Sequence, residues 1–129
     1  MRRVITFGTF DLFHIGHLNI IERAKAHGDY LIVGISSDKL NYSKKQKQPV
    51  CSQENRLRIV EALKATDEVF YEESLELKAE YIKKYKADVL LMGDDWKGKF
   101  DHLKSICEVV YLDRTPSIST TELIEIIKK

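Results

Sequence analysis

Short apolar runs alternate with longer segments of mixed polarity along the whole chain. The apolar runs are nearly continuous, and two of them read Leu31-Ile32-Val33 and Val89-Leu90-Leu91-Met92. Strands with this pattern are buried on both faces, which is typical of a parallel sheet covered by helices on either side. Five runs predict strands, at Val4–Phe7, Tyr30–Ile35, Glu68–Tyr71, Val89–Met92 and Glu108–Leu112.

The segments between these runs carry apolar residues at helical spacing. They predict helices at Leu18–Ala26, Leu57–Ala65 and Leu75–Tyr85 and a last helix from Thr120 onward. Residues that start or end helices support this assignment. Gly28 is placed to end the first helix, and Ser74 precedes the third. Ser119 and Glu122 form a capping-box pattern before the last. We therefore expect one domain over residues 1–129, an α/β fold that is Rossmann-like and doubly wound around a five-stranded parallel sheet.

Polar loops are expected after four of the strands. They span Gly8–His17, Asp38–Lys47, Gly93–Lys99 and Arg114–Thr121. The segment Asn41–Gln48 is polar without periodicity and is expected to be a loop throughout. In an open parallel sheet, ligands bind outside the carboxyl ends of the strands. We expect the four loops to meet at that edge and to form the functional site.

Composition excludes several broad classes. The chain has 129 residues, a net charge of +1, 43% hydrophobic residues and 32% charged residues, which favours neither a nucleic-acid partner nor an acidic tail. No apolar run approaches the ~20 residues that cross a bilayer, and the first residues do not form a signal peptide. These features predict a cytoplasmic protein without membrane contact. Cys51 and Cys107 show neither CxxC nor zinc-ligand spacing and are interpreted as reduced thiols.

The stretch Gly8–His17 carries the most specific chemistry. It joins a predicted strand to a predicted helix through a tight loop, and unpaired N–H groups at such a helix start suit a polyphosphate. His14 and His17 are three residues apart, so both rings lie near the same helix end. Gly16 between them leaves room for a nucleotide to approach. Two other interpretations remain open at this point: helix-capping histidines, or zinc ligands that would need further partners from distant residues.

Common catalytic signatures are missing from the sequence. It contains no GxxxxGK(S/T) phosphate loop, no GxGxxG, no HExxH and no GxSxG. Their absence argues against P-loop nucleotide hydrolysis, dinucleotide-dependent redox chemistry, zinc proteolysis and α/β-hydrolase chemistry.

Two motifs together resemble a known family. Gly8-Thr9-Phe10-Asp11-x-x-His14-x-Gly16-His17 resembles the signature of the cytidylyltransferase-type nucleotidyltransferases, which share the HIGH motif with class I aminoacyl-tRNA synthetases. The chain is too short for the catalytic and tRNA-binding parts of a synthetase. Arg114-Thr115-Pro116-Ser117-Ile118-Ser119-Thr120-Thr121 resembles the RTxGISTT motif of bacterial glycerol-3-phosphate cytidylyltransferases, with Ser117 in place of the usual glycine. The segment Met92-Gly93-Asp94-Asp95-Trp96-x-Gly98-x-Phe100-Asp101 is similar to that subgroup as well.

The resemblance implies a reaction of CTP with glycerol 3-phosphate that gives CDP-glycerol and pyrophosphate. It also implies magnesium bound to CTP, a homodimer, and a product used for wall teichoic acid or a capsular polymer. The attacking phosphate oxygen is already ionised near neutral pH, so the site needs charge stabilisation more than a strong base.

Residue roles follow from the family motifs. Those implied as catalytic are His14, His17, Lys44 and Arg114. The implied nucleotide contacts are Gly8, Thr9, Phe10, His14, Gly16, His17, Gly93, Asp94, Arg114, Thr115, Ser119, Thr120 and Thr121. The implied acceptor contacts are Asp11, Asp38, Lys44, Arg56, Lys78 and Trp96. No residue is expected to hold a resident metal.

Two departures from the family pattern bear on the acceptor. Leu75 stands where family members commonly have tryptophan, and Lys64 stands where they have arginine. Lysine cannot reproduce a bidentate arginine contact. Another polyol phosphate, phosphocholine or phosphoethanolamine therefore stays open as the acceptor. Adenylyl transfer from ATP and a non-catalytic nucleotide-binding role also stay open.

Overall fold

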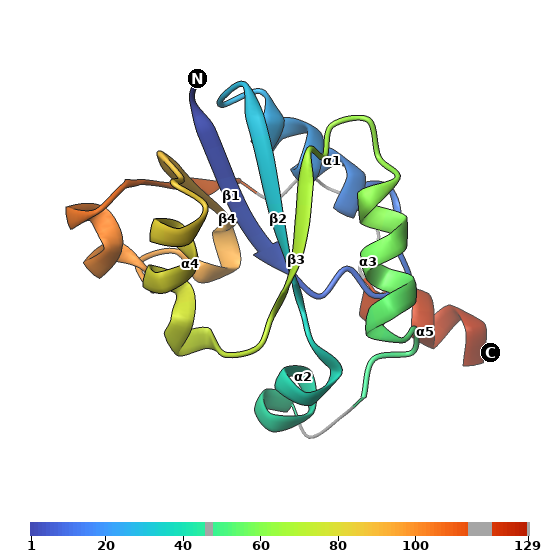
Figure 1. Cartoon of the computed structure of the whole chain (residues 1–129). Coiled ribbons are helices and arrows are strands. Elements are labelled where there is room, and N and C mark those ends of the chain that lie inside the picture. The colour runs from blue at the N-terminus through green and yellow to red at the C-terminus, as the bar shows by residue number, and fades with distance from the viewer. Residues whose placement is uncertain (46–47, 114–119, 129) are drawn as a thin grey trace.

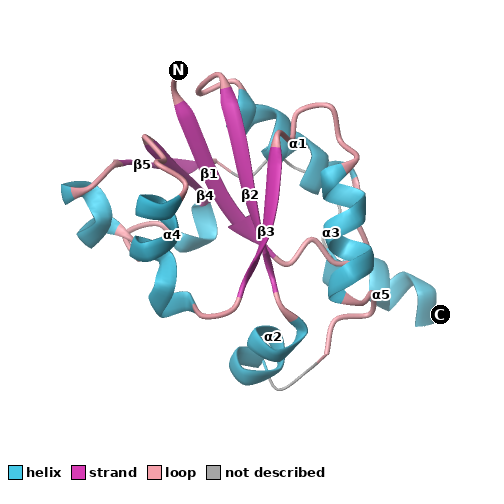
Figure 2. Cartoon of the chain, viewed as in Figure 1, coloured by secondary structure: helices cyan, strands magenta, loops and turns pink. Residues whose placement is uncertain are grey.

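Five parallel strands form one sheet at the centre of the molecule. A computed structural model describes residues 1–45, 48–113 and 120–128, except for the side chains of residues 44–45 and 121–123. The strands are β1 (Arg3–Gly8), β2 (Tyr30–Ser36), β3 (Glu68–Glu72), β4 (Val89–Gly93) and β5 (Glu108–Leu112). Their order across the sheet is β3-β2-β1-β4-β5, as Figure 2 shows in magenta. Every pair of neighbours is parallel.

Helices cover both faces of this sheet (Figure 1). The α-helices are α1 (Ile15–Lys25), α2 (Asp38–Lys45), α3 (Gln53–Glu61), α4 (Lys78–Lys84) and α5 (Thr120–Lys128). Three short 3-10 helices are Leu75–Leu77, Asp94–Trp96 and Asp101–Ser105. No helix within residues 1–45, 48–113 and 120–128 has the length and apolar character needed to span a bilayer.

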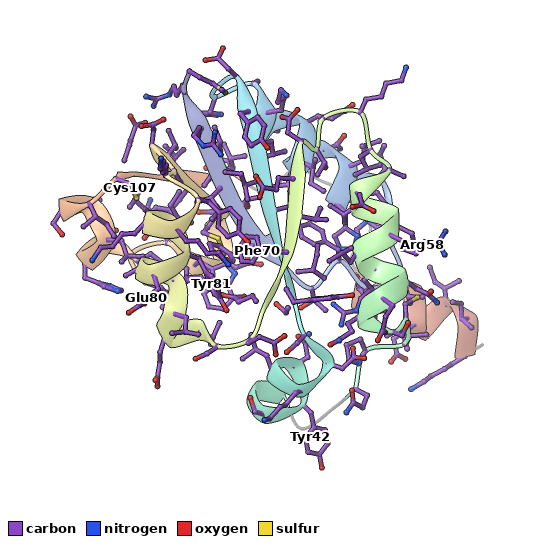
Figure 3. All side chains as sticks on the ribbon, in the orientation of Figure 1. Tyr42, Arg58, Phe70, Glu80, Tyr81 and Cys107 are labelled. Atoms are coloured by element: carbon purple, nitrogen blue, oxygen red, sulfur yellow. The ribbon has the colours of Figure 1, made fainter. Side chains whose placement is uncertain are left out.

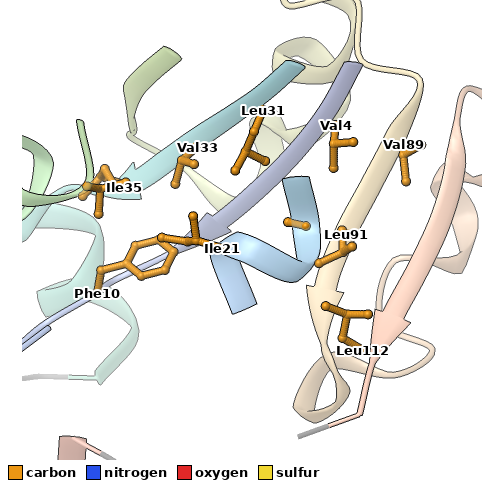
Figure 4. Packing of buried hydrophobic residues seen from close by; sticks show 11 residues of the cluster. Val4, Phe10, Ile21, Leu31, Val33, Ile35, Val89, Leu91 and Leu112 are labelled. Atoms are coloured by element: carbon orange, nitrogen blue, oxygen red, sulfur yellow. The ribbon is translucent and has the colours of Figure 1, made fainter. Parts of the chain in front are cut away.

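The hydrophobic core lies in two layers, one on each face of the sheet, because successive strand residues point to opposite faces. Val4 of β1 packs with Ile21 of α1 and Val60 of α3 on one face. Figure 4 shows this layer around Ile21. The next residue, Ile5, packs with Ile82 of α4 on the other face. Covering both faces explains why the strands read as continuous apolar runs.

The chain changes its direction of growth across the sheet at β1. After β1 it adds β2 and β3 on one side, and it then crosses over to add β4 and β5 on the other. β1 therefore pairs with both β2 and β4. Such a switch point leaves a crevice outside the carboxyl ends of the central strands. The loops that follow β1 and β4 open into this crevice.

The fold confirms the sequence prediction of a doubly wound α/β architecture with five parallel strands. The predicted strands differ from the observed ones only by one residue at some ends. The third predicted helix is divided between the 3-10 helix Leu75–Leu77 and α4, and Ser74 caps the 3-10 helix with its side chain. The predicted helix Leu57–Ala65 begins four residues earlier, at Gln53, because Ser52 accepts a hydrogen bond from the Asn55 N–H and starts α3 there.

Two sequence predictions of local structure were wrong. The segment expected to be a loop from Asn41 to Gln48 is helical as far as Lys45, as the second half of α2. The sequence of this segment shows only weak apolar periodicity. Its buried residue Asn41 is polar and is held by hydrogen bonds, so the helix has no apolar stripe. Gly28 does not end α1, whose C-cap is Ala26. Glycine is needed at 28 because a Cβ there would lie 2.6 Å from the Arg2 carbonyl oxygen.

Both cysteines are free thiols. Cys107 packs against the core layer that contains Ile82, and Cys51 lies in the loop before α3. Tyr42 is half exposed and projects from α2 away from the body of the molecule (Figure 3).

Candidate functional site

Two adjoining hollows lie at the carboxyl edge of the sheet. The larger, here the His17 compartment, has a volume of about 510 Å³, and the smaller, the Lys78 compartment, about 390 Å³. Both are lined by Phe7, Gly8, Thr9, Met92, Asp95 and Trp96, which form their common wall. The His17 compartment adds Asp11, Gly93 and Thr120, among others. The Lys78 compartment adds Ser36, Glu72, Leu75 and Lys99.

His14 and His17 begin helix α1 and cap it reciprocally. His14 is the N-cap, and its Nδ1 accepts a hydrogen bond of 3.0 Å from the Gly16 N–H. The Nδ1 of His17 accepts one of 3.2 Å from the His14 N–H. The two rings lie side by side, with centroids 4.0 Å apart. The capping interpretation of these histidines is thus confirmed, and capping uses only one nitrogen of each ring.

The capping contacts also fix the tautomers. A neutral imidazole whose Nδ1 accepts a hydrogen bond carries its proton on Nε2. Burial lowers the pKa of His17 to about 4, helped by neighbouring His14 and opposed by Asp11. Burial also lowers the pKa of His14. At neutral pH both rings are uncharged and each offers one Nε2–H donor. His17 lines the larger compartment, and the His14 ring lies next to it at an interplanar angle of 31°.

The loop between β1 and α1 is held in a strained conformation. Phe10 has φ of 55° and Leu12 has φ of 47°, values in the left-handed region that side chains disfavour. Phe10 is nevertheless buried, with its ring 5.6 Å from the ring of His17. A Cβ on Gly8 would lie 2.8 Å from the Phe10 ring, so glycine is required there. Packing therefore determines this loop, as is common at functional sites.

Asp11 ties the loop to two other segments. Its carboxylate accepts hydrogen bonds from the N–H groups of Val50, at 2.7 Å, and Cys51, at 2.8 Å. Its carbonyl oxygen accepts one from the Thr120 hydroxyl at the start of α5. Both carboxylate oxygens of this predicted acceptor contact are engaged with backbone groups.

Arg56 lies completely buried in α3 and connects the ends of two strands. Its Nη1 donates to the carbonyl oxygens of Thr9 and Ser36, both at 2.8 Å. Its Nη2 donates to Asp38 at 2.6 Å, and its Nε donates to the Cys51 carbonyl oxygen. Arg56 and Asp38, both predicted acceptor contacts, thus pair with each other and do not line either compartment.

A buried ion pair lies in the wall of the smaller compartment. Lys78 donates through Nζ to Glu72, and both residues are at most 3% exposed. Nζ also lies 4.5 Å from the centroid of the Phe7 ring and 5.1 Å from that of Phe100. Burial lowers the pKa of Lys78, and the carboxylate of Glu72 opposes this effect. The predicted acceptor contact Lys78 therefore lies in the same hollow as Leu75.

The loop after β4 supplies the rest of the common wall. Trp96 ends the 3-10 helix Asp94–Trp96 and packs against Phe100 with ring centroids 5.5 Å apart. Gly93 lines the larger compartment. Asp94 is exposed and lines neither, whereas its neighbour Asp95 lines both.

Several predicted residues cannot be placed in this geometry. Lys44 lies in α2 and Thr121 in α5, and their side chains are not described. Arg114, Thr115 and Ser119 lie outside the described residues. In the part of the chain that the structure describes, no three His, Cys, Asp or Glu side chains group as metal ligands.

The lining residues that sequence reasoning missed include Asn41, Glu72 and Asp95. Glu72 could have been found, because a charged residue directly after the apolar run of β3 falls at the carboxyl edge. Asn41 gave no signal, because its segment was interpreted as a solvated loop.

Known proteins match this chain along nearly its whole length. A sequence model of the family described as cytidylyltransferase-like matches residues 5–126. The chain is 53% identical over 125 residues to the glycerol-3-phosphate cytidylyltransferase of Bacillus subtilis strain 168, covering 97% of this chain and 96% of that protein. It is 45% identical to the enzyme of the same name from Staphylococcus aureus strain NCTC 8325, covering 95% of this chain and 92% of that protein.

The fold also matches a solved structure. The lipopolysaccharide core biosynthesis protein from Thermoplasma volcanium superposes with a TM-score of 0.77 at 24% identity, over 89% of this chain and 98% of that one. At this identity the likeness concerns the fold alone. The chain therefore belongs to the cytidylyltransferase-like family and, within it, to the glycerol-3-phosphate cytidylyltransferases.

Proposed function

We propose that this protein transfers the cytidylyl group of CTP to glycerol 3-phosphate and releases CDP-glycerol and pyrophosphate. Identity of 53% to a glycerol-3-phosphate cytidylyltransferase over 97% of the chain supports the choice of substrates. The observation that carries the mechanism is the reciprocal capping of His14 and His17, which leaves two neutral N–H donors at the start of α1.

We assign CTP to the His17 compartment and the acceptor to the Lys78 compartment. A phosphate oxygen of glycerol 3-phosphate would attack the α-phosphorus of CTP where the two compartments adjoin, along the common wall. The new P–O bond forms as the bond from the α-phosphorus to pyrophosphate breaks. Charge that grows on the transferring group and the leaving group would be stabilised by the two Nε2–H donors and the positive end of α1. Neutral donors suit this role because they need not lose or gain a proton.

Cationic side chains complete the proposed mechanism. Lys44 and Arg114 are the candidates near the nucleotide phosphates, and Lys78 is the candidate near the acceptor. CTP would enter as its magnesium complex, and the ion would offset part of the negative charge of the phosphates. Asp11, Asp38 and Arg56 would support the site from within the protein, since their polar atoms already bind protein groups.

A second acceptor stays a candidate because of Leu75. This leucine lines the Lys78 compartment, which has a volume of about 390 Å³. A different phosphorylated alcohol could occupy such a hollow, for example a longer polyol phosphate, phosphocholine or phosphoethanolamine.

A panel of phosphorylated acceptors tests both candidates. Each acceptor is incubated with labelled CTP, and in parallel with ATP, and pyrophosphate release is measured. We expect kcat/KM to be highest for glycerol 3-phosphate with CTP. Preference for another acceptor would reassign the substrate, preference for ATP would reassign the base, and no turnover with any pair would favour a non-catalytic role.

We further propose a homodimer that acts in the cytoplasm, where CTP is made. CDP-glycerol would then serve a transferase that builds a teichoic acid or capsular polymer of glycerol phosphate. Sedimentation equilibrium of the purified protein tests the dimer, and a mass of one chain at micromolar concentration would contradict it.

A further inference from the structure

Asn41 is a buried polar residue between the two strand ends of the site. It belongs to α2, is 1% exposed and lines the His17 compartment. Its Nδ2 donates to the carbonyl oxygens of Ser36, at 3.2 Å, and Ser37, at 3.0 Å. Its Oδ1 accepts a hydrogen bond of 2.9 Å from the Thr9 hydroxyl. All the polar atoms of this side chain are therefore used.

These contacts determine how the amide is oriented. Two carbonyl oxygens can be satisfied only by the NH₂ group, so the amide oxygen must face Thr9. The Thr9 hydroxyl has a single proton and gives it to Asn41. The rotamer of Thr9 and the direction of its remaining lone pairs are thus fixed by a residue 32 positions away.

The position of Thr9 gives this contact its importance. Thr9 lies in the common wall, and Arg56 also holds its carbonyl oxygen. Its side chain is partly exposed, in contrast to the buried Asn41. Asn41 lines only the larger compartment, and it contacts two residues that line the smaller one, Thr9 through Oδ1 and Ser36 through Nδ2. The helix that contains Asn41 also carries Lys44.

We propose that Asn41 is a positioning residue that sets the Thr9 hydroxyl at the boundary between the compartments and so determines how the acceptor is seated. The proposal rests on the proposed function, because it takes the Lys78 compartment to hold the acceptor phosphate. Asn41 has two separable roles. Its Nδ2 contacts hold α2 against the end of β2, and its Oδ1 contact acts on the site through Thr9.

A double-mutant cycle separates these roles. The variants are Asn41→Ala, Thr9→Val and the double variant, with KM for glycerol 3-phosphate and for CTP measured separately. We expect each single variant to raise the KM for glycerol 3-phosphate by roughly tenfold. Because Thr9 and Asn41 also line the His17 compartment, the KM for CTP can rise as well, but a rise in the KM for CTP alone would overturn the proposal. The KM of the double variant for glycerol 3-phosphate should exceed that of the more impaired single variant by no more than about threefold. Partial unfolding alone lowers the amount of active enzyme and does not raise KM.

Two further variants complete the test. Asn55→Ala is the matched control, because Asn55 is exposed on α3 and lines neither compartment. Thr9→Ser keeps the hydroxyl and should retain the wild-type KM for the acceptor. If the two single effects multiply in the double variant, raising its KM for glycerol 3-phosphate by roughly a hundredfold, the proposal is overturned. If Asn41→Ala does not fold, an unchanged acceptor KM in Thr9→Val overturns it instead. Wild-type protein without turnover would count against the proposed function and not against the cycle.

Discussion

Each histidine of α1 combines a structural contact and a chemical one in a single ring. The Nδ1 atoms cap the helix, and the Nε2–H groups remain available to a ligand. A carboxamide in place of His14 can therefore cap the helix without reproducing the donor of the imidazole. This separation allows the two roles to be measured independently.

We predict that His14→Ala and His14→Asn both lower kcat by about a hundredfold or more, because a donor to the developing charge is lost. The dissociation constant of CTP should change by less than about tenfold. His14→Ala should also lose about 1 kcal/mol of stability, which His14→Asn should retain because asparagine is a good N-cap. Steady-state kinetics, calorimetric CTP titration and urea unfolding measure these quantities.

His102→Ala serves as the control, since His102 is exposed in the 3-10 helix Asp101–Ser105. Equal losses in CTP binding and in kcat for the His14 variants would exclude a role specific to the transition state.

The lowered pKa of His17 predicts a pH dependence of stability. An unfolded histidine titrates near 6.5, whereas His17 in the folded protein titrates at about 4. Between these values the unfolded state binds more protons. The free energy of unfolding should therefore fall as the pH is lowered from about 6.5 towards 4. The His17→Gln variant lacks this contribution to the fall in the free energy of unfolding. Its urea unfolding midpoints at pH of about 7 and 4.5 should therefore differ less than those of the wild type. An identical difference in both proteins would show that His17 titrates normally.

At the scale of secondary structure elements, Arg56 of α3 links the carboxyl ends of two strands to the start of another helix. Its guanidinium reaches β1 through Thr9, β2 through Ser36 and the start of α2 through Asp38. A planar group with five donors can satisfy acceptors in several directions, and an ammonium group cannot do so from the same position. The carboxyl edge of the sheet is thereby fixed by one side chain from α3.

We predict that Arg56→Lys lowers the free energy of unfolding by about 3 kcal/mol, because two backbone carbonyl oxygens and the partly buried Asp38 carboxylate lose their partner. Activity should fall as well, since the Thr9 carbonyl loses its anchor. Chemical unfolding and steady-state kinetics measure the two effects. Arg58→Lys on the exposed side of the same helix is the matched control and should match the wild type (Figure 3). A stable Arg56→Lys protein with a raised KM for glycerol 3-phosphate would instead support direct acceptor contact.

At the scale of the whole molecule, the sheet topology brings the site together. The reversal at β1 leaves the ends of β1 and β4 beside each other, and the loops that follow them form the common wall. The two core layers support this edge from both faces of the sheet. Phe10 connects the larger compartment to the layer of Ile21, and Phe100 connects Lys78 to the layer of Ile82.

The local sequence pattern correctly predicted the elements that are stabilised by burial of apolar side chains. It failed for segments whose structure depends on polar contacts. The strands were predicted correctly because a sheet covered on both faces needs continuous apolar runs. Helix α2 was missed because Asn41 is buried through hydrogen bonds and leaves no apolar period. Gly28 was misassigned because the contact that requires glycine comes from Arg2, far away in the chain.

The sequence by itself determined the parallel α/β fold and predicted a polyphosphate-binding role for Gly8–His17, and its two motifs pointed to the family. These properties depend on residues close together in the chain, where spacing translates directly into geometry. Only the tertiary structure decided which nitrogen of each histidine is free, that Arg56 and Asp38 bind each other, and that Asn41 holds Thr9. The last two contacts join residues 18 and 32 positions apart, and their partners are chosen by how the strand ends meet and not by any local pattern.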